Sequence, residues 1–226
     1  MSFGTTLKSS IGAKVLMAVT GVLLLLFVIG HMLGNLQVFL GPDKLNAYAA
    51  TLQGLGPLLW VIRIGLLAIL AVHVAAAAKV VAMSKGARPV PYQKTKTLAT
   101  SFAARTMLVS GILILLFVIY HVLHFTTGHI DLAGSYGGVD AEGRHDVYTM
   151  VVAGFQDLTT CAIYIIAMTL LCMHLSHGIS SLMQTMGLRK AGNAATVDKV
   201  GPIFAGVLWL GNVSMPLAAI TGMLTV

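Results

Sequence analysis

The sequence predicts an all-α membrane protein, a bundle of five transmembrane helices. Of its 226 residues, 57% are hydrophobic and only 9% are charged, and the mean hydropathy is +0.90. Such a composition is typical of an integral membrane protein. Five apolar stretches reach the roughly 20 residues that a helix needs to cross the hydrocarbon layer, without the alternation of barrel strands. We expect one domain over residues 1–226, with spans at Val15–Leu40, Pro57–Met83, Thr106–Thr126, Val151–Met183 and Pro202–Val226.

The first stretch follows Lys8 and Lys14, as the apolar region of a secretory signal would. Its length of about 26 residues is too great for a signal peptide. We therefore interpret it as a retained first helix.

Basic residues are divided unequally between the two ends of the predicted helices. Lys and Arg are retained on the cytoplasmic side of a membrane, so the N-terminus is predicted inside and the C-terminus outside. The net charge of +7 is then mostly a topology signal; it can also dock an acidic lipid or protein, and nucleic-acid binding is not expected. The inner end carries Lys8, Lys14, Lys79, Lys85, Arg88, Lys94, Lys96, Arg105, Arg189, Lys190 and Lys199, and the outer end only Lys44, Arg63 and Arg144. Most of the acids lie at the outer end, namely Asp43, Asp131, Asp140, Glu142, Asp146 and Asp157.

Each of the first four predicted helices contains a histidine. An ionisable side chain at bilayer depth costs several kcal/mol and usually faces the bundle interior, where it binds or transfers something. His31 lies 17 residues after Lys14, and His121 lies 16 residues after Arg105. At 1.5 Å per residue, both are about 24–26 Å from the inner end. They should therefore lie together near the outer face.

The second pair is predicted in the inner half of the membrane. His73 precedes Lys79 by six residues, about 9 Å along a helix. His174 is two-thirds of the way along a helix that also runs inward. Because two ligands of one metal must share a depth, we pair His73 with His174 and His31 with His121.

Two pairs of imidazoles at two depths predict two stacked haems. The chain contains no C-x-x-C-H string, so the haems would be held without thioether bonds, as in b-type cytochromes. Cys161 and Cys172 lie about 16 Å apart on one helix, too far for a disulfide. Iron held by two imidazoles has no open position and transfers electrons. Since the chain has no flavin or dinucleotide fingerprint, we expect a partner subunit to exchange electrons with it.

An internal repeat supports the outer pair. Residues 21–34 match residues 111–124 in nine of fourteen positions, with His31 aligned to His121 rather than to His124. His174 and His177 share a helix face, and spacing alone does not choose between them. His124 and His177 are candidates for hydrogen bonds to the ligands or for propionate contacts. Glycines near the ligands can admit a flat macrocycle or a neighbouring helix; they are Gly30, Gly34, Gly111 and Gly178.

Nearly the whole chain resembles one family. The strings that carry the resemblance are SSIGAKVLMAVTG, LLFVIGHMLGNLQVFLG, RIGLLAILAVHV, LLFVIYHVLHF and MHLSHGISSLMQTMG. They resemble the single-chain, five-helix, dihaem cytochrome b membrane anchor, of type B, in succinate dehydrogenase and fumarate reductase, the succinate:quinone oxidoreductases. The family's haem ligands fall on His31, His73, His121 and His174. Gly178, four residues after His174, matches the family and selects His174 over His177.

The resemblance implies a multi-pass protein of the bacterial inner membrane with partners on its cytoplasmic face. These are a flavoprotein subunit with FAD and an iron–sulfur subunit. The quinone, usually menaquinone in dihaem anchors, would bind near the outer haem. Arg63, about 15 Å from His73, is a further candidate for this pocket or would instead neutralise a propionate of the outer haem. Candidates for the quinone pocket are Asn35, Gln37, Asn46, Tyr48 and Gln53.

Cys172 stands where some fumarate reductases of this family carry a glutamate that moves protons across the membrane. A thiol is a poor replacement for that carboxylate at neutral pH, so we expect electron transfer that is not charge-compensated at this residue. An alternative reading is the dihaem cytochrome b subunit of another membrane dehydrogenase, such as a hydrogenase or a formate dehydrogenase. A haem-free transporter is disfavoured, because the sequence has no broken helices, inverted repeats or acids inside the spans.

Overall fold

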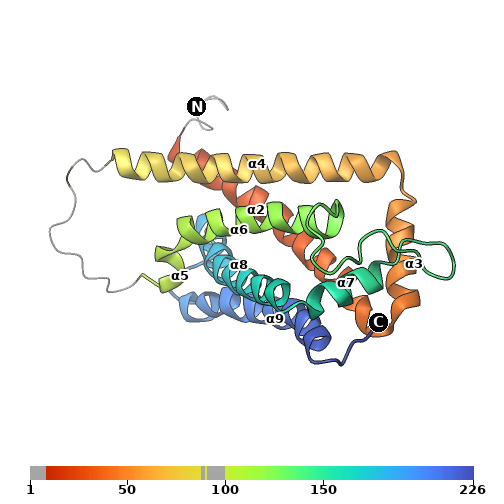
Figure 1. The fold of residues 1–226 in the computed structure, drawn as a ribbon. Coiled ribbons are helices and arrows are strands. Elements are labelled where there is room, and N and C mark those ends of the chain that lie inside the picture. Colours follow the sequence, from red (N-terminus) through yellow and green to blue (C-terminus); the bar gives the residue numbers. More distant parts are fainter. Residues whose placement is uncertain (1–8, 88–89, 91–99) are drawn as a thin grey trace.

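The computed structural model describes residues 9–87, 90 and 100–226, and this part of the chain is helical without a named strand. Its long helices are α2 (Ser10–Asn35), α4 (Pro57–Gly86), α6 (Met107–His121), α8 (Leu158–Thr185) and α9 (Ala194–Ile220) (Figure 1). Among the described residues, five helices are long and apolar enough to cross a membrane. The prediction of an all-α protein with five such spans is confirmed.

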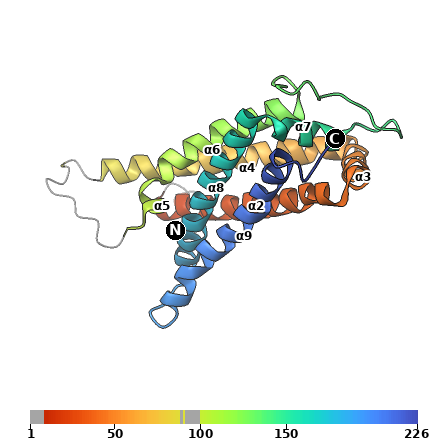
Figure 2. The same ribbon diagram turned by 60° about the horizontal axis from the view of Figure 1, so that its bottom comes forward.

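Shorter elements lie at the two ends of these helices. The 3-10 helix η1 (Leu36–Leu40) extends α2, and a π-helical turn η2 (Val122–Thr126) extends α6. Helices α3 (Pro42–Gln53) and α7 (Val147–Gln156) lie at the same end as the C-terminus, whereas α5 (Phe102–Arg105) and the α8–α9 connection lie at the other (Figures 1 and 2). Following the predicted orientation, we call these the outer and inner ends.

The structure corrects the boundaries of the last two predicted spans. The stretch predicted as one helix from Val151 is broken at Asp157, whose backbone is extended (φ −71°, ψ 120°). The Asp157 carboxylate accepts a hydrogen bond of 2.7 Å from the backbone N–H of Thr160 and so caps α8. Helix α9 begins at Ala194, before the predicted start at Pro202, and contains this proline in its interior.

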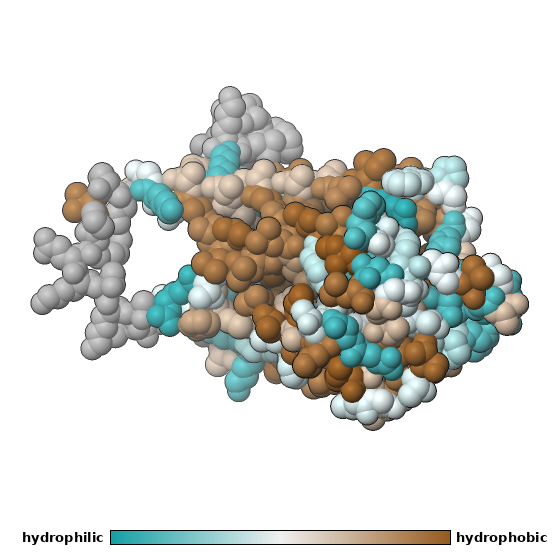
Figure 3. Space-filling model, in the orientation of Figure 1, coloured by the Kyte–Doolittle hydropathy of each residue, from teal (hydrophilic) through white to brown (hydrophobic). Residues whose placement is uncertain are grey.

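The long helices pack as two groups. Helix α4 packs mainly against α2, while α6 packs against α8 and α8 most closely against α9. The largest buried cluster lies where α7, α8 and α9 meet η1 and α3; it includes Val38, Val152, Phe155, Tyr164 and Met215. By contrast, Ala76 is the only buried residue of α4. Hydrophobic side chains cover the middle of the molecule over α4 and α6, and polar side chains gather at the outer end (Figure 3).

A polar network fixes the outer loop, which we define as residues 127–146. Arg144 donates to Asp140 at 2.7 Å and to Asp43 of α3 at 3.0 Å. Asn46, also on α3, is only 1% exposed; its amide donates to Asp140 and Asp146, and its oxygen accepts from the N–H of Tyr148. These bonds hold the loop on top of α3.

The charged residues follow the predicted division between the ends. Lys14, Lys85 and Arg105 lie at or near inner helix termini, and Arg189 closes the α8–α9 connection through two bonds to Asp198 of 2.7 and 2.9 Å. Four of the basic residues used in the topology prediction lie outside the described residues: Lys8, Arg88, Lys94 and Lys96.

Candidate cofactor-binding site

The structure brings His31 of α2 and His121 of α6 together. Their ring centroids are 5.7 Å apart and their planes are almost perpendicular, at 83°. Metal–imidazole bonds are about 2.0–2.1 Å long, so two imidazoles on opposite sides of one metal have centroids about 6 Å apart. The observed separation therefore fits two axial ligands of one metal.

The surroundings of this outer pair repeat between the two helices. Phe27 stacks on His31 with ring centroids 5.4 Å apart, and Phe117 stacks on His121 at 5.9 Å. Each phenylalanine lies four residues before its histidine, which places both on the same helix face. The Asn35 side-chain nitrogen lies 3.1 Å from His31 Nε2. A metal bound at His31 Nε2 would take the place of this amide.

Tyr164 of α8 supports the other outer histidine. Its hydroxyl lies 3.1 Å from His121 Nδ1 and 3.1 Å from Nδ1 of His124. His124 is buried, at 3% exposure, and stacks on Phe125 with ring centroids 3.9 Å apart. Since one phenol can accept one bond and donate another, Tyr164 can satisfy both rings and leave Nε2 of His121 for a ligand role. His124 therefore contacts the same Tyr164 hydroxyl that supports His121.

The inner pair predicted from the sequence is His73 of α4 and His174 of α8, and each of these rings lies against a hydroxyl group. His73 Nδ1 lies 3.1 Å from the Thr20 hydroxyl, and His174 Nδ1 lies 3.2 Å from the Ser110 hydroxyl. In both cases the partner belongs to a helix that carries an outer histidine. His177 is half-buried one turn beyond His174.

The chemistry of these donors suits a metal that brings its own equatorial ligands. Within the described part of the chain, no three His, Cys, Asp or Glu side chains converge on one point. The intramembrane histidines instead occur as pairs from neighbouring helices, and neutral imidazole is the form that binds a metal. Paired imidazoles without further protein donors would suit a haem, which would bring the remaining ligands itself.

The other predicted site residues have varied surroundings. A Cβ atom at Gly34 would collide with the Tyr48 ring, so Gly34 makes room for Tyr48. No atom lies within 4 Å of a Cβ placed at Gly30 or at Gly178. The Arg63 guanidinium lies 5.0 Å from the Trp60 ring centroid in α4. Of the four glycines predicted near the ligands, Gly30 and Gly178 have open space beside them, whereas Gly34 and Gly111 do not.

The polar quinone-site candidates separate into buried and accessible side chains. Asn46 is buried beneath the outer loop with its two N–H groups bonded to carboxylates. Gln53 is exposed and Gln37 half-buried at the outer end. Cys172 is buried at 7% exposure and packs with Met32, Ala205 and Leu208.

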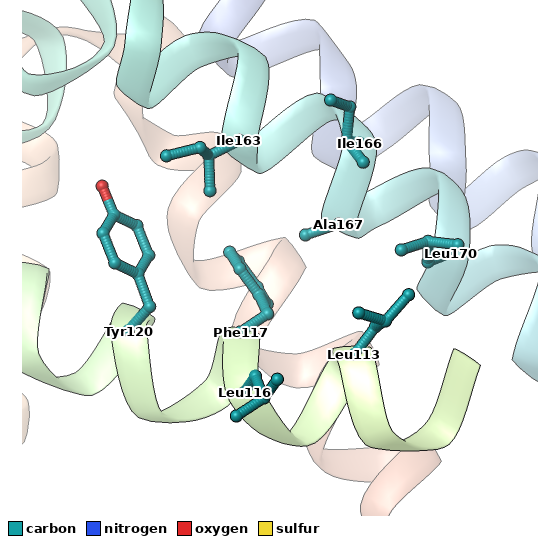
Figure 4. A pocket seen from close by; sticks show the side chains of 8 residues that line it. All are labelled: Leu113, Leu116, Phe117, Tyr120, Ile163, Ile166, Ala167 and Leu170. Atoms are coloured by element: carbon teal, nitrogen blue, oxygen red, sulfur yellow. The ribbon is translucent and has the colours of Figure 1, made fainter. Parts of the chain in front are cut away.

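An open groove runs between α6 and α8, lined by aliphatic and aromatic side chains (Figure 4). Its polar group is the Tyr120 hydroxyl, which is buried and has no hydrogen-bond partner among the described residues. The groove is lined by Leu113, Leu116, Phe117, Tyr120, Ile163, Ile166, Ala167 and Leu170.

Sequence reasoning missed the groups that hold the histidine rings. Thr20 and Ser110 directly precede the aligned repeat, and comparing one more residue upstream would have paired these hydroxyls. Tyr164 carried no comparable sequence signal, because its partners come from a different helix.

The fold and the site define a class: a multi-pass helical membrane protein with two pairs of intramembrane histidines. The comparisons with known proteins narrow this no further, since no family model, curated protein or solved structure matches the chain.

Proposed function

We propose that this chain is the membrane-anchor cytochrome b subunit of a succinate:quinone oxidoreductase. The observation that carries the proposal is the approach of His31 to His121, at 5.7 Å between ring centroids, together with the matching hydroxyl contacts of His73 and His174. The family resemblance of the sequence selects this class among dihaem cytochromes. The chain would pass electrons between an iron–sulfur subunit and a quinone, and the dicarboxylate chemistry would reside on a partner.

The proposed ligands of the outer haem b are His31 and His121, and those of the inner haem b are His73 and His174. Bound haem would supply reversible one-electron transfer without an open coordination position. The chain's own contribution is to orient the imidazoles. Phe27 stacks on one outer ring, and Tyr164 orients the other through its hydroxyl.

The two ends of the bundle would serve different partners. The inner end gathers most of the basic residues, which suits an acidic docking surface on an iron–sulfur subunit that is itself joined to the FAD-containing flavoprotein. The outer end would bind menaquinone, with Asn35, Gln37 and Gln53 as accessible polar groups and Arg63 facing a haem propionate. This arrangement belongs to a bacterial cytoplasmic membrane.

Haem stoichiometry tests the proposal. A reduced-minus-oxidised spectrum of the purified complex should show b-type bands and two haems per chain. His31→Ala or His121→Ala should remove the outer centre and leave the inner one, and His73→Ala should do the reverse. His129→Ala, in the exposed outer loop, is the matched control and should retain both. A colourless preparation would overturn the proposal, and co-purification with hydrogenase or formate dehydrogenase subunits would favour the alternative.

A further inference from the structure

Two hydroxyl groups hold the inner histidines from the helices that carry the outer ones. We propose that Thr20 and Ser110 are positioning residues for the two inner histidines, an inference that rests on the proposed function. They fix the rings of His73 and His174 so that both Nε2 atoms are presented to one metal. Both hydroxyl residues are buried, Thr20 at 6% and Ser110 at 2% exposure.

The hydrogen-bond pattern favours the same tautomer for both rings. The Thr20 hydroxyl donates to the carbonyl of Leu16 at 2.8 Å, and the Ser110 hydroxyl donates to that of Met107 at 3.1 Å. A hydroxyl has a single proton; with that proton donated to the carbonyl, its oxygen accepts at the contact with Nδ1. Each imidazole therefore carries its proton on Nδ1 and has a free lone pair on Nε2. This is the state in which a histidine binds a metal while its other nitrogen is oriented by a partner.

A glycine beside each hydroxyl brings the ring close to the helix backbone. A Cβ atom at Gly21 would lie 3.4 Å from His73 Cε1, and one at Gly111 would lie 3.5 Å from His174 Cε1. Both distances are at van der Waals contact, so each ring packs directly against the helix backbone. The Thr-Gly and Ser-Gly dipeptides thus form two equivalent seats for an imidazole.

The spacing of each seat to the outer ligand is the same on both helices. Thr20 precedes His31 by eleven residues, and Ser110 precedes His121 by eleven. Eleven residues are close to three turns, or about 16 Å, so seat and ligand lie on one face of the helix. Each of α2 and α6 therefore serves both levels: it supplies a ligand to the outer pair and seats an inner ligand from the helix packed against it.

Variants without the hydroxyl test the proposal in the intact complex. Thr20→Val keeps the side-chain shape, Ser110→Ala is smaller, and both remove the acceptor. Without it the imidazole becomes a weaker donor, so the inner haem should bind about 10- to 100-fold more weakly. Weaker donation disfavours ferric iron most, so the inner midpoint potential should rise, by about 59 mV for each tenfold selective loss of ferric affinity. The outer haem should be unchanged.

Matched variants separate positioning from packing. Thr20→Ser should restore the wild-type potential. Ser214→Ala, on α9, removes a hydroxyl that, within the described residues, bonds only to Gly211 of its own helix, and it should change neither centre. If Thr20→Val does not assemble, Ser110→Ala tests the same role with a smaller change. Two haems in every variant with wild-type potentials would overturn this inference and leave the proposed function intact. A wild-type complex without haem would overturn the proposed function itself.

Discussion

Replacing Tyr164 by phenylalanine removes one oxygen atom that two histidines share. The ring can stay where it is, packed against Phe117 and Phe155 at centroid distances of 5.0 Å. Only the hydroxyl is lost, and with it the 3.1 Å contacts to His121 and His124. The change therefore isolates two hydrogen bonds from the packing of the aromatic cluster.

The surroundings set the size of the effect. Interhelical hydrogen bonds in membranes average about 0.6 kcal/mol, so two of them give about 1.2 kcal/mol. Buried polar groups left without a partner cost more, about 1–3 kcal/mol each. Tyr164 is 5% exposed and His124 is 3% exposed, so neither water nor lipid can replace the lost bonds easily. We expect Tyr164→Phe to lower the free energy of unfolding by about 2 kcal/mol.

Tyr120→Phe is the matched control, because this tyrosine is a neighbour in the same cluster. Its ring centroid lies 6.0 Å from that of Tyr164, but its buried hydroxyl has no hydrogen-bond partner among the described residues. Removing that hydroxyl should leave stability unchanged or raise it slightly. Unfolding of the purified variants in mixed micelles, followed by loss of helical circular dichroism, measures both. If both variants lost the same stability, or Tyr164→Phe lost none, the shared hydroxyl would not be what orders these histidines.

Three further predictions concern the outer end. Gly34→Ala should destabilise the protein by about 1–3 kcal/mol, because its methyl group meets a tyrosine ring, while thermal unfolding of Gly30→Ala should show no loss. Asn46→Ala removes three hydrogen bonds and should speed trypsin cleavage in the outer loop by roughly 30- to 100-fold; equal rates for it and exposed Gln53→Ala would refute the role of the loop network. Burial raises the pKa of Asp146, but hydrogen bonds from Asn46 and the first turn of α7 outweigh it and hold the pKa below its ordinary value. The folded state then binds fewer protons than the unfolded state. This stabilisation is therefore complete above pH of about 4 and is lost as the pH falls through the pKa that Asp146 has in the folded state. If cleavage of the outer loop by a protease active in acid did not become faster at low pH, this prediction would be contradicted.

The five spans and the closeness of His31 to His121 were predictable because they depend on quantities that are local in sequence. Hydropathy over about 20 residues finds a span, and the rise per residue converts spacing into depth. Helix boundaries depend on single residues instead. Asp157 ends α7 and caps α8 within an apolar stretch, so a hydropathy window passes over it. At Pro202 the error was the reverse: the prediction began the last helix at this proline, but a proline inside a membrane helix can be accommodated by its neighbours, and α9 continues through it.

The polar residues of the outer end show what sequence could not provide. Asn46 and Gln53 are seven residues apart on one short helix and were equally good candidates for a quinone pocket. The structure separates them, because the outer loop returns about a hundred residues later and covers Asn46 with two aspartates. Contacts of this separation leave no periodic trace in one sequence. The hydroxyl residues Thr20 and Ser110, by contrast, could have been found from the sequence, because they occupy the position directly before the repeat of residues 21–34 and 111–124.

The position of α4 links the proposed cofactors to assembly of the bundle. With Ala76 as its only buried residue, this helix gains little from packing beyond its contact with α2. His73 lies on α4, and its predicted partner His174 lies on α8, in the second group. A metal shared by these two residues would therefore be a strong bond between α4 and α8, and the metal shared by His31 and His121 would join α2 to α6 in the same way. In this protein the cofactors that would carry electrons would also hold the two helical groups together, so loading and tertiary stability should be coupled by mass action.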